Sequence, residues 1–195
     1  KTHGLGLVIL WHLPVTCVTA LMIWFRYRAS VLKRELLLVF IVSCVMMFFY
    51  WLCFVALPGE IVKLVPPDNH GAIIEKVYEF ISICIIAPIF EEIFKFLMVR
   101  VIAYRAWVVD ADGLIAYAAV VGCLFAIVEN VMYCCEAADH NDERRLAGYL
   151  VRVTGFIFHP VGVCISTALF AQRRFLGKNY NFFKCIWMSV TFHFV

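Results

Sequence analysis

Long apolar segments recur along this chain, and they constrain its fold more than any other feature. Hydrophobic residues make up 64% of the sequence, against roughly 45–50% in an ordinary soluble domain. A helix needs about 20 apolar residues to cross a bilayer. Segments that reach or approach this length lie at 5–25, 36–57, 78–103, 112–135, 151–171 and 182–195. The sequence therefore predicts an all-α, polytopic membrane protein with about six transmembrane helices.

Nothing in the sequence divides these segments between domains. No internal repeat, low-complexity tract or long linker interrupts them, so we expect residues 1–195 to form one transmembrane domain. The last segment, 182–195, ends with the chain, and we expect its helix to be truncated. The net charge of +3 is small, and no basic run alternates with aromatic residues. These features favour the lipid bilayer as a partner and argue against nucleic acid.

The connections between the apolar segments alternate in charge. The first and fifth, 26–35 and 172–184, carry four basic residues each, and the third, 100–112, carries two arginines and two aspartates. The second and fourth are nearly balanced or acidic. Basic connections face the cytosol in most multi-pass membrane proteins. We therefore predict that the odd-numbered connections are cytosolic and the even-numbered ones lie outside or in a lumen.

Seven polar residues stand inside these apolar segments. A charged side chain at the centre of a membrane helix costs about 2.5–3.5 kcal/mol on insertion scales, and it usually faces the bundle interior and pairs with other polar groups. Counting residues at a rise of about 1.5 Å each predicts that four of them, Glu92, Glu129, His159 and His193, lie between the midplane and the outer face. We expect them to converge on one polar cavity. They are Glu91, Glu92, Lys95, Glu129, Asn130, His159 and His193.

The spacing of the first three residues allows two different arrangements. Glu91 is four residues from Lys95 and Glu92 is three residues away, so either carboxylate can pair with the ammonium on one helix. Adjacent residues diverge by about 100° around a helix, so the two glutamates face different neighbours. A helix-packing ion pair is the structural alternative for these three residues. Interhelical hydrogen bonds and structural histidines are the corresponding alternatives for the other four.

Four stretches resemble the motifs of the PrsW-type intramembrane proteases. "EEIFK", residues 91–95, fits the family's E-E-x-x-K, and "FAIVENVMY", residues 125–133, fits its F-x-x-x-E-N-x-x-Y. "RVTGFIFHPVGVCISTALFA", residues 152–171, is similar to the third motif, a membrane histidine followed by small residues. "TFHFV", residues 191–195, looks like the start of the fourth motif. The resemblance runs from Ala87 to His193 and implies kinship with the CAAX prenyl proteases and bacteriocin-processing membrane proteins.

The resemblance implies a hydrolytic site and leaves two mechanisms open. In one, Glu91 is the base that activates water, with Glu92 and Lys95 setting its charge and orientation. The remaining polar residues (Glu129, Asn130, His159 and His193) then position water or bind the tetrahedral intermediate. In the other, a metal ion such as zinc is held by ligands drawn from Glu92, Glu129, His159 and His193. No H-E-x-x-H motif decides between these mechanisms.

The function implied is cleavage of a membrane-anchored protein near the outer or lumenal side of the bilayer, and by analogy with the CAAX proteases we expect a water activated by the buried glutamate. Two other classes of function remain open at this point. An inactive membrane scaffold could keep the same fold, and an ion- or proton-coupled transporter could use buried Glu, Lys and His as a relay. Transporters commonly show internal repeats, and this sequence has none.

Overall fold

The computed structural model describes residues 33–52, 76–77, 81, 85–105, 108–139 and 157–193. This described part consists of helices and short connections and contains no strand, which confirms the predicted all-α class. The predicted first segment, 5–25, lies outside it. Five helices follow one another: α2 (Lys33–Trp51), α5 (Ala87–Ala103), α6 (Ala111–Asp139), α8 (Phe158–Leu176) and α9 (Phe182–His193).

Local sequence signals explain where several of these helices begin. Asp110 Oδ1 accepts a 2.6 Å hydrogen bond from the Gly113 backbone N–H at the start of α6. Asn181 Oδ1 accepts one of 2.8 Å from the Lys184 N–H at the start of α9. Both are N-caps, in which a short polar side chain satisfies a backbone donor that has no partner within the helix. Pro88 lies in the first turn of α5, where its missing N–H costs nothing.

The end of α8 differs from the sequence prediction. The predicted segment ends at residue 171, whereas the helix continues through two arginines to Leu176. Gln and Arg are favourable helix formers, so the helix extends past its apolar portion. It stops at Gly177, whose φ of 67° is left-handed, and the Lys178 N–H turns back to the Gln172 carbonyl at 3.2 Å. A glycine readily adopts this conformation because it has no Cβ.

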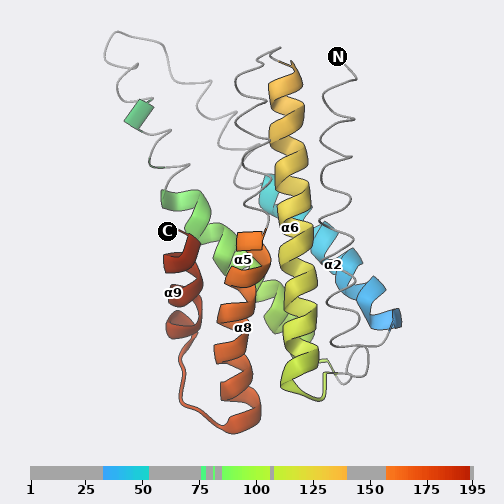
Figure 1. The fold of residues 1–195 in the computed structure, drawn as a ribbon, viewed down its shortest axis with the longest axis vertical. Helices are drawn as coiled ribbons and strands as arrows, with labels where there is room; N and C mark the ends of the chain where they lie inside the picture. The colour runs from blue at the N-terminus through green and yellow to red at the C-terminus, as the bar shows by residue number, and fades with distance from the viewer. Residues whose placement is uncertain are drawn as a thin grey trace.

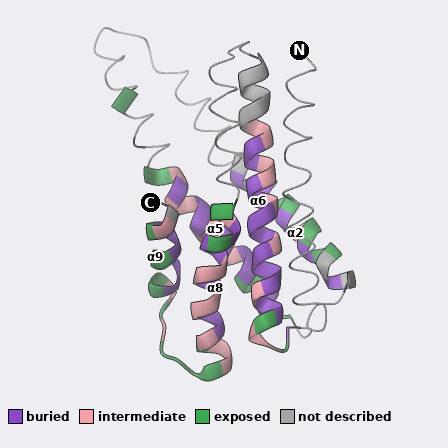
Figure 2. Cartoon of the chain, in the orientation of Figure 1, coloured by how far each residue is buried: buried purple, intermediate pink, exposed green. Residues whose placement is uncertain are grey.

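α5 lies at the centre of the described helices and packs against all four of the others. In Figure 1 it passes behind α8 and α6, while α2 and α9 lie on opposite sides of the bundle. Its buried positions include Pro88, Glu91, Lys95, Val99 and Ile102, spaced three to four residues apart along one face. Because neighbours surround α5, the charged residues Glu91, Glu92 and Lys95 are buried, whereas Arg100 in its last turn is exposed. Figure 2 shows burial concentrated on α5, α6 and α8 and exposure on the outer faces of α2 and α9.

The exposed faces carry large apolar side chains. On α2 these include Leu37, Phe40 and Phe48, and on α9 Phe183 and Trp187. Within the described residues, one helical stretch, Ala111–Met132, is long and apolar enough to cross a membrane by length and composition. Two shorter apolar helical stretches are Leu37–Tyr50 and Phe182–Phe192. The prediction of six membrane helices is therefore neither confirmed nor excluded and stays a prediction.

Candidate active site

Three charged side chains of α5 are buried in the middle of this bundle. The side chain of Lys95 is fully buried, and Glu91 and Glu92 are also classed as buried. Glu91 turns toward α2, where its Oε1 accepts a 3.4 Å hydrogen bond from the Tyr50 hydroxyl. Glu92 turns toward α9, where its Oε2 accepts a hydrogen bond from Ser189 Oγ. The predicted divergence of the two adjacent glutamates is confirmed by these contacts.

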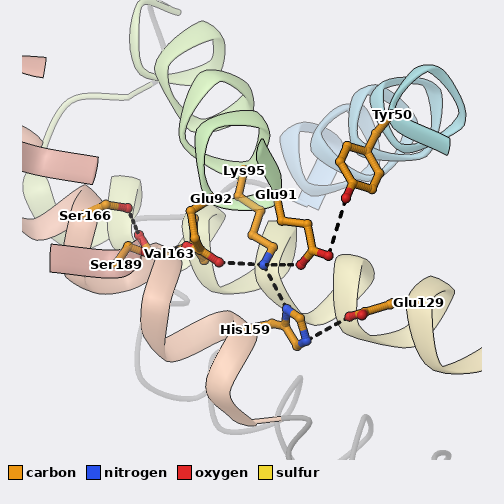
Figure 3. A network of polar contacts seen from close by, with 9 residues as sticks. All are labelled: Tyr50, Glu91, Glu92, Lys95, Glu129, His159, Val163, Ser166 and Ser189. Carbon is orange, nitrogen blue, oxygen red and sulfur yellow. Dashed lines mark hydrogen bonds and ion pairs between the residues drawn. The ribbon is translucent and has the colours of Figure 1, made fainter. Parts of the chain in front are cut away.

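The ammonium of Lys95 joins the two glutamates to α8 (Figure 3). Its Nζ lies 2.7 Å from Glu92 Oε1 and 3.5 Å from Glu91 Oε2, and 2.8 Å from Nδ1 of His159. Nζ also lies 4.3 Å from the centroid of the Phe125 ring, a cation–π distance. Lys95 therefore bridges both carboxylates, an imidazole and an aromatic face.

His159, the second residue of α8, lies between Lys95 and Glu129. Its Nε2 is 3.0 Å from Glu129 Oε2 on α6. A lysine ammonium has donors and no acceptor, so beside it Nδ1 of the histidine must accept. The ring proton then resides on Nε2 and points at the Glu129 carboxylate. This arrangement assigns a tautomer to His159 from the chemistry of its neighbours.

Aromatic stacking and close helix packing fix the position of the His159 ring. The ring stacks on Phe125, with centroids 5.9 Å apart and planes inclined by 26°. One turn earlier on α6, Gly122 meets Pro160, the residue after the histidine. A Cβ placed on Gly122 would lie 2.4 Å from Pro160 Cα and 2.8 Å from Val163 Cγ1. Only a glycine at this point lets α6 and α8 approach so closely.

The structure brings five of the seven predicted site residues into one connected cluster. Asn130 is buried on α6 next to Glu129. His193 is the last residue of α9, and its side chain lies outside the described part of the chain. Sequence reasoning missed Tyr50 and Ser189, which hold the two glutamates. The sequence signal for them is a hydroxyl within an apolar helix, but α2 also carries Ser43 and α9 also carries Thr191, so this signal does not single them out. The five connected residues are Glu91, Glu92, Lys95, Glu129 and His159.

Three of these residues could hold a metal ion. Glu91, Glu129 and His159, from three different helices, each offer one ligand atom, and these atoms all lie within 4.8 Å of one another. Carboxylate oxygen and imidazole nitrogen are the donors of catalytic metal sites, which use three protein ligands and leave one position open. The donor set therefore fits a divalent cation, which would displace the ring proton that His159 carries in the metal-free protein. Glu92, which the sequence offered as a ligand, instead contacts Lys95 and Ser189.

A cluster of ionisable groups buried in an apolar helical bundle defines a class of membrane protein that performs chemistry or transport inside the bilayer. The comparison with protein families is consistent with that class. The PrsW family of intramembrane metalloproteases matches residues 34–195, which is most of the chain. The chain belongs to this family, as the four motifs indicated. No curated protein and no solved structure shows a significant match.

Family membership establishes a membrane protease, hence a hydrolase. It implies an integral membrane protein in a bilayer, with a membrane protein as substrate, and it does not favour the scaffold or the transporter. The family's description as metalloproteases accords with the metal-binding geometry of Glu91, Glu129 and His159.

Proposed function

We propose that this protein cleaves a peptide bond of a membrane-anchored protein at a metal site formed by Glu91, Glu129 and His159. The observation that carries this proposal is the convergence of these three ligand atoms within 4.8 Å of one another inside an apolar bundle. Their mixed oxygen and nitrogen donors suit zinc among the divalent cations available to proteins. When bound, such an ion polarises a carbonyl and acidifies water.

The chain's own residues have separate tasks in this proposal. Tyr50 donates to Glu91 Oε1 and so orients that carboxylate from α2. Lys95 offsets the charge of Glu92 and contacts Glu91, which lowers the electrostatic cost of placing several carboxylates together. In the metal-free protein Glu129 accepts a hydrogen bond from Nε2–H of His159, and this proton would leave when a metal ion binds. Asn130, buried beside Glu129, and His193, at the end of α9, are the proposed partners of the tetrahedral intermediate.

A water activated by Glu91 without a metal remains the alternative mechanism, and one experiment separates the two. The full-length protein in detergent is assayed with a quenched library of membrane peptides, with and without a strong zinc chelator. We expect the chelator to abolish cleavage and zinc to restore it. Glu91→Gln and Glu129→Gln should each lower kcat/KM at least about a hundredfold, because each removes a ligand or base. Metal bound per chain, measured by elemental analysis, should fall in both variants.

The matched control is Glu35→Gln, which changes a buried glutamate in the first turn of α2. Glu35 lies 15 residues before Tyr50, about 22 Å along the helix, so cleavage should persist. If both site variants lose cleavage while the chelator has no effect, the metal-free glutamate mechanism replaces the proposed one. A wild-type protein that binds no metal and cleaves no peptide would contradict the proposed function and favour the scaffold.

We further propose a multi-pass topology with the basic connections in the cytosol and cleavage near the opposite, outer or lumenal, face. The connections α5–α6 and α8–α9 lie at the same end of the bundle in Figure 1, and the N-terminal end of α2 points toward it. Arg174 of α8 also donates a 3.3 Å hydrogen bond to the Val108 carbonyl in the α5–α6 connection. Because these connections lie at the same end of the bundle, their arrangement supports the predicted alternation between cytosolic and outer connections.

An epitope inserted beside exposed Lys178 tests the topology, because Lys178 lies in the α8–α9 connection. We expect antibody access only from the cytosolic side of sealed membranes. Access from the other side would reverse the orientation and the proposed side of cleavage.

A further inference from the structure

A hydrogen bond from Ser189 of α9 to Glu92 of α5 has no role in the proposed reaction. Ser189 is almost fully buried, and its Oγ donates to Oε2 of Glu92. The other oxygen of the same carboxylate, Oε1, accepts from Lys95 Nζ at 2.7 Å. Glu92 is therefore held at both oxygens, by a hydroxyl on one side and an ammonium on the other.

A chain of contacts runs from this serine to the proposed metal ligands. Lys95 Nζ, held by Glu92, lies 2.8 Å from Nδ1 of His159, and Nε2 of the same ring lies 3.0 Å from Glu129. The end of a lysine side chain rotates freely unless its hydrogen bonds fix it. The orientation of Glu92 therefore determines where the ammonium meets the His159 ring.

The packing of α8 leaves room for this contact and for little else. A Cβ placed on Gly162 would lie 3.1 Å from Ser189 Oγ and 3.4 Å from Glu92 Oε2. The absence of a side chain at Gly162 thus allows the hydroxyl and the carboxylate to meet against the backbone of α8. Figure 3 shows Ser189 and Glu92 on the side of Lys95 opposite Glu91 and Tyr50.

We propose that Ser189 is a positioning residue which, through Glu92 and Lys95, sets the orientation of the His159 ring. The hydrogen bond of the serine goes to Glu92, which is not one of the proposed metal ligands, so the serine acts on the site through Glu92 and Lys95. It also makes the active site depend on how α9 packs against α5 and α8. The inference deepens the proposed function and rests on it only for its kinetic consequence.

The test uses two readouts on the full-length protein in detergent. The first is ¹⁵N NMR of histidine-labelled, metal-free protein, with the His159 signals assigned by their loss in His159→Gln. In the wild type we expect one set of His159 signals, because the contacts hold the ring in a single position. Ser189→Ala should shift or broaden these signals, and Ser189→Thr, which keeps the hydroxyl, should restore the wild-type signals. Gly162→Ala should act like Ser189→Ala, because its methyl group crowds the same contact.

The second readout is cleavage of the membrane peptide. Removing a hydrogen bond to a charged group should lower kcat about tenfold or more, with KM unchanged because the contact does not involve substrate. The matched control is Ser166→Ala. Ser166 is equally buried, but its Oγ donates to the Val163 carbonyl of its own helix at 2.9 Å, so neither readout should change.

Either of two results would overturn the inference. One is an unaltered His159 signal and unaltered kcat in Ser189→Ala. The other is an equal loss of kcat in Ser166→Ala. That result would mean that Ser189, like Ser166, contributes only to packing. If Ser189→Ala fails to fold, Gly162→Ala provides the same comparison. The NMR readout needs neither metal nor turnover, so it judges the role of Ser189 even if the proposed protease reaction is not observed.

Discussion

Replacing Lys95 with methionine is expected to destabilise the folded protein by about 3–5 kcal/mol. Methionine keeps much of the volume but removes the ammonium that contacts both Glu91 and Glu92. Breaking a buried ion pair from one side leaves a charge without its partner, which costs more than the pair itself contributed. The loss can be measured as the shift in an SDS-induced unfolding transition of the full-length protein in detergent micelles.

Two further variants separate this electrostatic effect from a packing effect. Lys184→Met on α9 removes an exposed ammonium 4.7 Å from the Tyr180 ring centroid, and it should cost less than about 1 kcal/mol. The double variant Glu92→Gln with Lys95→Met should be less destabilised than the sum of the single variants, because the two side chains are coupled. Additive losses, or a loss no larger than that of Lys184→Met, would mean that the buried network does not stabilise the fold.

Helical periodicity allowed much of this network to be predicted from sequence. The separations of three and four residues placed Lys95 beside both glutamates, and both pairs are present. The angle between consecutive residues predicted that Glu91 and Glu92 face different helices, and they do. These features are local to α5, so they follow from the geometry of a single helix.

Contacts between helices could not be predicted in the same way. Nothing in the spacing within α5 indicates that Glu91, rather than Glu92, lies with Glu129 and His159. That choice depends on which helix each glutamate faces, and hence on packing. Gly122 shows the same limit, because its role depends on Pro160 of α8 lying directly against it. The hydroxyls of Tyr50 and Ser189 became meaningful only once α2 and α9 were placed around α5.

Changes at His159 are expected to have the largest effect on function, and two substitutions divide the roles of its nitrogens. Asparagine places a polar atom near the position of Nδ1 and can still accept from Lys95, whereas glutamine reaches toward the position of Nε2. Neither provides an imidazole ligand, so both should lower kcat/KM by about a thousandfold or more. Metal affinity should fall by more than the 10- to 100-fold typical of changes outside the ligand set.

Stability should distinguish these two variants even though both lose activity. His159→Asn keeps an acceptor for the buried Lys95 ammonium, so it should unfold closer to the wild type than His159→Gln does. His140→Gln, in the polar stretch 140–145, is the matched control and should leave cleavage and metal content unchanged. Metal binding that survives in both His159 variants would remove this histidine from the ligand set. Glu91 and Glu129 would then need a different third partner, and the Lys95–His159 contact would serve only the packing of α5 against α8.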